Sequence, residues 1–141
     1  MLTVREMWSR IFIGFLAFQI VLVGLAFLAA NTGTVLSEDA NKRIDAMRQV
    51  FQSICALGVV TMIAFTRSKL HPDNAKSPQD LIRATVLALA IGELTVLFAL
   101  VGLAKNHLDQ FLIAAGLVFL ADLIMVRPAG SKILSSPAPR K

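Results

Sequence analysis

The sequence predicts an all-α integral membrane protein, a compact bundle of four helices that crosses the bilayer four times. Of its 141 residues, 56% are hydrophobic and only 16% are charged, a balance far from that of a soluble domain. Four apolar stretches each approach the roughly 20 residues that a helix needs to cross a hydrocarbon core of about 30 Å. Strands are not expected, because an isolated strand in lipid leaves its backbone groups unpaired and no stretch alternates like a barrel strand.

The first two spans are expected at about residues 11–30 and 48–66. Turn-forming residues at 31–33 end the first span. A cleaved signal peptide is the alternative interpretation of this span, since basic residues precede it, but its apolar run is longer than a usual signal core. The second apolar stretch is short, and residues 41–49 are expected to continue it as a helix into the headgroups.

The third span is expected at about residues 81–104 and has the clearest start signal. Ser77 is a candidate N-cap, Pro78 suits the first helical position, and Asp80 in the first turn favours the helix dipole. This combination predicts that the third helix begins at Pro78.

The fourth span is expected at about residues 110–126, after a short loop. The Arg127-Pro128 pair is expected to stop its helix. Residues 1–130 are therefore predicted to form one transmembrane domain. Residues 131–141, which contain several Ser and Pro, are predicted to be a disordered cytoplasmic tail.

The distribution of basic residues predicts the orientation of the bundle. Of the 14 Lys and Arg, ten lie at the termini and in the middle connection: Arg5, Arg10, Arg67, Lys69, Lys76, Arg83, Arg127, Lys132, Arg140 and Lys141. The other four are Lys42, Arg43, Arg48 and Lys105. By the positive-inside rule, both termini face the cytoplasm, in what we expect to be a bacterial inner membrane. Basic loops at anionic lipid headgroups explain the net charge of +5 better than nucleic acid does.

Glu93 is the ionisable residue expected at the centre of the membrane, about 18 Å from the start of its span at 1.5 Å per residue. No cationic residue shares its depth, so burial disfavours the charged form and a neutral acid is the expected resting state. Ser53 and Cys55 of the second span are expected level with it, and Gln19 about one turn nearer the cytoplasm. Three roles remain open for Glu93: a reversible proton or cation site, a permanently protonated structural residue, or a contact with another subunit.

Asp122 is expected to have a different role. It lies only about 6 Å from the predicted end of the fourth span at 1.5 Å per residue. In an antiparallel pair of helices this places it near Arg83 and Arg127. An interfacial ion pair with these arginines is the expected arrangement.

Residues 79–104 resemble the ion-binding helix of rotary ATP synthase c subunits. That helix follows a basic loop that contains a proline, begins near an arginine and carries one carboxylate at mid-membrane, which Pro78, Arg83 and Glu93 match here. The resemblance implies an ion-binding role for Glu93. The chain departs from that family because its preceding span has only Gly58 in place of repeated glycines, and because it has two further spans. The third and fourth spans together, with Glu93, the short loop at residues 105–110 and the Arg127-Pro128 pair, resemble small uncharacterised four-helix inner-membrane proteins of bacteria.

Enzymatic chemistry has no support in the sequence. His71 and His107 are predicted on opposite sides of the membrane, so they cannot bind one metal ion together. No nucleophile elbow, P-loop or dinucleotide fingerprint occurs, and Cys55 has no second cysteine to pair with. We therefore expect a protein that is not an enzyme and has no metal or cofactor.

The function first expected is that of a non-catalytic accessory or structural subunit of a larger membrane complex. The alternative is a homo-oligomeric transporter linked to protons or another cation through Glu93. Expected partners are the lipid bilayer and either other membrane subunits or a second copy. Contact is expected through small residues at helical spacing on the third span: Ala84, Ala88, Gly92, Thr95, Ala99 and Gly102.

A reporter fused after Lys141 tests the predicted orientation. We expect a reporter that works only in the cytoplasm to be active, and an export-dependent reporter to be inactive, because the basic residues gather on the side of both termini. The opposite pattern would refute the orientation.

Overall fold

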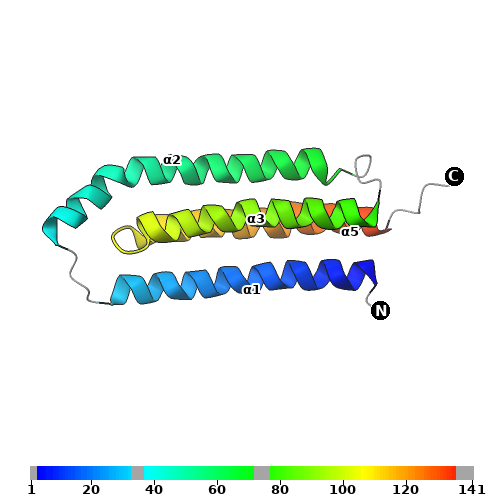
Figure 1. Ribbon diagram of the computed structural model, residues 1–141, viewed down its shortest axis with the longest axis horizontal. Coiled ribbons are helices and arrows are strands. Elements are labelled where there is room, and N and C mark those ends of the chain that lie inside the picture. Colours follow the sequence, from blue (N-terminus) through cyan, green and yellow to red (C-terminus); the bar gives the residue numbers. More distant parts are fainter. Residues whose placement is uncertain (1–2, 33–36, 72–76, 136–141) are drawn as a thin grey trace.

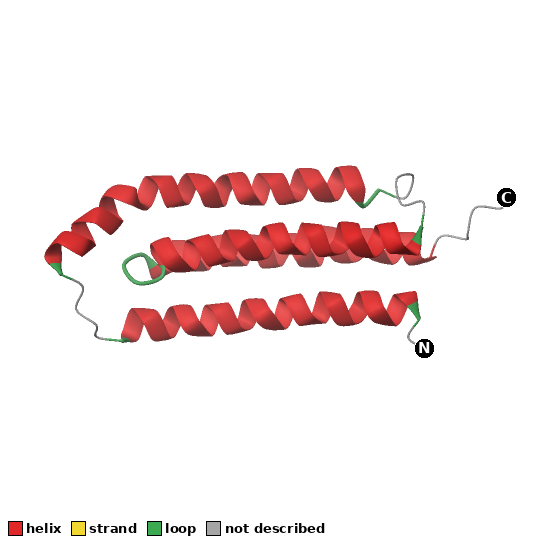
Figure 2. Cartoon of the chain, viewed as in Figure 1, coloured by secondary structure: helices red, strands yellow, loops and turns green. Residues whose placement is uncertain are grey.

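The computed structural model describes residues 3–32, 37–71 and 77–135, and these residues form helices joined by short connections (Figure 2). In chain order the elements are α1 (Val4–Asn31), α2 (Glu38–Lys69), α3 (Pro78–Leu103), α4 (Leu108–Ala121), the π-helical segment η1 (Asp122–Val126) and α5 (Arg127–Ser135). α4, η1 and α5 continue one another as a single rod, Leu108–Ser135, which we call the fourth rod.

The elements run along one long axis. α1 and α2 lie on opposite sides of the central pair made by α3 and the fourth rod (Figure 1). α1, α2, α3 and the fourth rod are each long and apolar enough to cross a membrane. The prediction of an all-α four-helix bundle with four candidate membrane spans is therefore confirmed.

Side-chain caps fix where the helices begin. The Ser77 hydroxyl accepts a hydrogen bond from the Asp80 backbone N–H at 3.1 Å, with Pro78 in the first position, as predicted. Thr3 and Glu6 form a capping box at the start of α1. These contacts satisfy backbone donors that a helix start would otherwise leave unpaired.

The fourth rod does not stop at Pro128, which corrects the predicted span end at residue 126. Residues 131–135, which we predicted to be disordered, are helical, whereas 136–141 lie outside the described residues. A proline ring inside a helix conflicts with the carbonyl four residues earlier, here that of Ile124. The wide π turn of η1, in which the Arg127 N–H donates to the Asp122 carbonyl, accommodates this conflict.

The small-residue face of α3 lies inside the bundle. Apart from the half-buried Ala84, its members are buried. A Cβ added at Gly92 would approach Val118 and Met62, and one at Gly102 would overlap the Phe51 ring. This face is therefore occupied within one chain, which corrects its predicted role in contacting another subunit.

α2 extends past the other helices at its amino-terminal end and bends there (Figure 1). Three contacts connect the amino-terminal part of α2 to the end of the central pair where α3 meets α4, and in one of them Asn106 Nδ2 donates to Asn41 Oδ1 at 3.5 Å. His107 Nε2 lies 2.8 Å from Asp45 Oδ1, and Gln52 Nε2 donates to Gln110 Oε1 at 2.8 Å. The predicted helical continuation through 41–49 is confirmed, and it starts as early as Glu38.

Gly102→Ala tests the close packing of α2 against α3. The new methyl group would overlap Cγ and both Cδ atoms of the Phe51 ring. Because these atoms lie close to the backbone, rotation of the side chain does little to remove the overlap. We expect a loss of about 1–3 kcal/mol, measured as a lower midpoint of thermal unfolding in detergent.

Gly116→Ala is the matched control, because a Cβ there meets nothing within 4 Å. It should leave the midpoint unchanged or raise it, since alanine favours a helix over glycine by about 1 kcal/mol. Equal losses in the two variants would contradict the packing described here.

Candidate functional site

Three polar side chains from three helices lie close together in the middle of the bundle: Gln19 of α1, Glu93 of α3 and Asp122 at the start of η1. They are 4%, 5% and 0% exposed, respectively. Gln19 Nε2 donates a hydrogen bond to Asp122 Oδ2 at 2.6 Å. Gln19 and Asp122 are also the groups that act electrostatically on the Glu93 carboxyl. We call these three residues the central cluster.

Each member of the central cluster lies near the middle of its own span. Gln19 is in the middle part of Val4–Asn31, Glu93 of Pro78–Leu103, and Asp122 of Leu108–Ser135. The sequence placed Asp122 near the membrane surface because Pro128 was expected to stop the helix. With the helix continuing to Ser135, Asp122 lies about 20 Å from that end at 1.5 Å per residue.

The expected ion pair of Asp122 with Arg83 and Arg127 is replaced by the hydrogen bond to Gln19. Within the described ranges, neither arginine forms an ion pair with Asp122. Arg127 meets Asp122 through its backbone N–H, and both arginine side chains are exposed. An aspartate at this depth is out of reach of guanidinium groups that extend to the membrane surface.

Ser53 and Cys55 do not join Glu93 in the described structure. The Ser53 hydroxyl donates to the Gln49 carbonyl at 2.8 Å, and the Cys55 thiol points toward the Thr95 carbonyl at 3.9 Å. They lie on α2, whereas the polar neighbours of Glu93 come from α1 and the fourth rod. The signal for Gln19 was present in the sequence, as a lone amide within an apolar span.

Four oxygen atoms of the central cluster have no hydrogen-bond partner among the described residues: Gln19 Oε1, both carboxyl oxygens of Glu93, and Asp122 Oδ1. All four are inaccessible to solvent. Leaving a buried acceptor unpaired costs about 1–3 kcal/mol, and more if it is charged. In the part of the chain that the structure describes, no lysine or arginine side chain bonds to these atoms. Two adjacent acids in such a place are stable when they hold protons or a bound cation, since two bare carboxylates repel each other.

Two cavities flank the contact between Gln19 and Asp122 along the seam between α1 and the fourth rod. One, of about 460 Å³, runs from Arg5 to Leu16 on α1 and reaches Leu123 of η1. The other, of about 300 Å³, begins at Gln19 and continues toward the opposite end of the bundle, as far as Val23 on α1 and Leu112 on α4. The central cluster therefore lies between two grooves on this seam.

Other potential chemistry is sparse in the described part of the chain. No three His, Cys, Asp or Glu side chains come together there in a way that could hold a metal ion. The Asp45 and His107 pair lies at the end of the bundle where α3 connects to α4, about 14 helical residues from the level of Glu93.

No protein-family model, curated protein or solved structure matches this chain. The likeness of residues 79–104 to c subunits is thus not accompanied by a family match. What the fold and the site define is a class of protein: an integral membrane protein of four candidate spans with a buried cluster of two acids and an amide.

A double-mutant cycle tests the hydrogen bond between Gln19 and Asp122. We expect Gln19→Leu and Asp122→Leu to be coupled by about 0.6–2 kcal/mol in thermal unfolding, because each variant alone leaves the other polar group without its partner. The exposed pair Gln52 and Gln110, also an interhelical amide contact at 2.8 Å, is the matched control.

Coupling in the exposed pair should be smaller, since water replaces a lost partner there. Additive effects of Gln19→Leu and Asp122→Leu would rule out the buried hydrogen bond.

Proposed function

We propose that this protein is a transporter linked to protons or another monovalent cation, and that the central cluster exchanges the coupling ion. The observation that carries the proposal is the set of four buried oxygen atoms without hydrogen-bond partners, contributed by Gln19, Glu93 and Asp122. The sequence alone favoured an accessory subunit, because one mid-membrane carboxylate, continuous helices and few internal polar groups gave little support for transport.

A paired acid supports reversible ion binding better than a single acid does. A lone buried carboxyl group is stable as a permanently neutral acid. With a second acid nearby, the two groups can share one proton or hold one cation between them, and the Gln19 amide can donate to one acid while its oxygen faces the ion. Binding and release of the ion then change the net charge of a site without water. The ion-bound and ion-free states therefore favour different helix packing around the central cluster.

The backbone near Asp122 supports the same proposal. Transporters commonly bind their ions where a membrane helix is interrupted at mid-depth. The α-helical pattern of the fourth rod changes to a π turn at Asp122, and π turns occur frequently at functional sites. The cavities on either side of the cluster leave space for α1 to shift against the fourth rod.

An accessory subunit remains the second candidate because of the α2 extension. Its residues beyond the bundle carry exposed charges, among them Lys42, Arg43 and Asp45, and form a surface that a larger protein could contact. Native mass after gentle extraction distinguishes the candidates: a homo-oligomer or monomer favours the transporter, and copurifying larger chains favour the subunit.

We also propose that the protein has no catalytic activity and no cofactor, and that both termini face the cytoplasm of a bacterial inner membrane. The absence of recognisable nucleophile, metal and nucleotide motifs in the sequence supports the first part. The excess of Lys and Arg on the side of the termini supports the second.

Ion flux into liposomes tests the transporter. The purified full chain is reconstituted, a membrane potential is imposed, and entry of H⁺, Na⁺ or K⁺ is followed with trapped indicators. We expect one of these ions to enter faster than into protein-free liposomes. Glu93→Gln and Asp122→Asn should each slow entry at least about tenfold, since a positioned proton-transfer group commonly contributes more than that.

Asp109→Asn is the control, because Asp109 is an exposed acid in the first turn of α4. It should retain the flux of the unmodified protein. Flux of no ion above the protein-free level would overturn the proposal. So would full flux in Glu93→Gln with loss in Glu93→Ala, since glutamine keeps the shape of the acid but cannot release a proton.

A further inference from the structure

The larger cavity has a polar end and an apolar end. Its polar lining comes from both walls: Arg5 and Ser9 on α1, and Arg127, Ser131 and Ser135 on the fourth rod. Farther in, the lining becomes apolar at Phe12, Leu16 and Leu123. We call this cavity the basic groove.

The two arginines of the basic groove are positioned to meet an anion. Both are exposed, and neither has an ion-pair partner in the described ranges. Nearby acids are engaged elsewhere: Glu6 accepts the Thr3 backbone N–H in the capping box, and Asp122 accepts from Gln19. The groove therefore carries two positive charges that no acid among the described residues neutralises.

The wall of the groove is held in place by specific contacts. The Trp8 and Phe12 rings stack with centroids 5.5 Å apart and an interplanar angle of 8°. Trp8 Nε1 donates to Thr85 Oγ1 at 2.9 Å, and Gly130 of α5 packs directly against the indole. An added side chain at Gly130 would overlap that ring. The shape of the groove thus depends on fixed aromatic rings and not on flexible side chains.

The dimensions of the groove suit an amphiphile. Arg5 to Leu16 spans about 16 Å of helix at 1.5 Å per residue, close to half of a hydrocarbon core. Arg5 lies near the start of α1, at headgroup depth, whereas Arg127 lies eight residues, about 12 Å, before the end of the fourth rod, from where its long side chain can extend toward the headgroups. The apolar end lies beside the central cluster. A volume of about 460 Å³ is in the range of small-molecule sites.

We propose that the basic groove binds one anionic phospholipid of the surrounding bilayer. Its phosphate lies between Arg5 and Arg127, with hydroxyl groups such as Ser9 and Ser131 in reach, and one acyl chain lies against Phe12, Leu16 and Leu123. Basic pockets between membrane helices recognise anionic headgroups in this way. The proposal is independent of ion transport, because it uses none of the residues of the central cluster.

Native mass spectrometry of the full chain tests this proposal. Protein in mild detergent is mixed with phosphatidylglycerol or phosphatidylcholine of the same acyl chains, and retained lipid is counted. We expect one phosphatidylglycerol to bind per chain, with an affinity about thirtyfold higher than that of phosphatidylcholine. This ratio corresponds to about 1 kcal/mol for each of two arginines near an anionic headgroup. Arg5→Gln/Arg127→Gln should abolish the preference.

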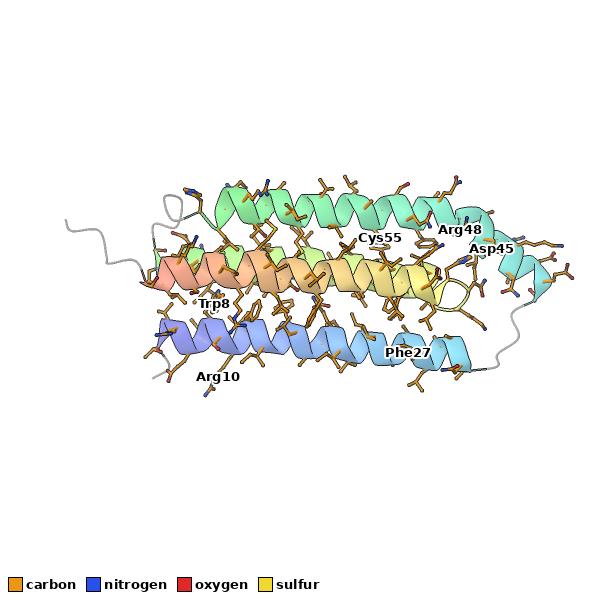
Figure 3. All side chains as sticks on the ribbon, turned by 180° about the vertical axis from the view of Figure 1, so that it is seen from behind. Trp8, Arg10, Phe27, Asp45, Arg48 and Cys55 are labelled. Atoms are coloured by element: carbon orange, nitrogen blue, oxygen red, sulfur yellow. The ribbon has the colours of Figure 1, made fainter. Side chains whose placement is uncertain are left out.

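Arg10→Gln/Arg67→Gln is the matched control, since it removes the same charge from exposed arginines of the same end of the bundle. Arg10 points away from the fourth rod, whereas Trp8 points toward it (Figure 3). The control should keep the bound phosphatidylglycerol. Equal loss in both double variants would show attraction by general surface charge and overturn the site.

A third variant tests the apolar end. Leu123→Trp adds bulk to the floor of the groove without changing its charge and should reduce lipid retention. Displacement of phosphatidylglycerol by inorganic phosphate at equal concentration would overturn the lipid assignment in favour of a simple anion site. Equal retention of phosphatidylcholine would overturn it as well. Thermal unfolding of each variant confirms that the arginine substitutions leave the fold intact.

Discussion

The hydrogen bond between Gln19 and Asp122 joins the middle of α1, a sparsely buried helix, to the rest of the bundle. In the most apolar stretch of α1 only 22% of residues are buried, against 50% in α3. In lipid, apolar contact between helices has little driving force of its own, so polar contacts and close packing decide which helices stay together. Trp8 and Thr85 make the other described side-chain hydrogen bond of α1 to the bundle. The two bonds hold α1 at its middle and near its start, and its far end has neither.

α3 occupies the opposite position in the packing. Its small residues let α2 and the fourth rod approach closely, so α3 contacts every other span. Glu93 lies on this best-packed helix, whereas its polar neighbours lie on α1 and the fourth rod. In the central cluster, the Glu93 carboxyl group is on the well-packed α3, whereas the Gln19 amide is on the less buried α1. One side of the cluster is therefore held rigidly and the other side can move. This division supports an exchange site better than a structural bond, which would lie between well-packed helices.

Much of the architecture could be predicted from the sequence, because span length, hydropathy and caps are local properties. The Ser77 cap and the four spans are examples. The depth of Glu93 along its helix was equally accessible, since depth needs only a count of residues. The identity of its neighbours was not, because that depends on how the helices rotate and on which pairs pack. Ser53 and Cys55 have suitable depth but lie on α2, on another side of α3 from α1.

Asp122 shows a different limit of sequence reasoning. A proline usually ends a helix in water, whereas a membrane helix continues through it because breaking the helix would expose more backbone to lipid. Pro128 was therefore a poor guide to the end of the span, and the error moved Asp122 from the centre of the bilayer to its surface. The same proline accounts for the π turn, which no periodicity in the sequence signals.

The π turn also sets the angular phase of the fourth rod. In an uninterrupted α-helix, positions 122 and 130 differ by about 80° around the axis, since each residue advances about 100°. A π turn absorbs one extra residue, so the two positions come within about 20° of each other. Asp122 can thus meet Gln19 while Gly130 meets Trp8, both on α1. Residues 122 and 130 are eight positions apart, but their directions around the axis are those of residues seven positions apart in a regular α-helix. The one additional residue in the π turn therefore lets a single helix line both the central cluster and the basic groove.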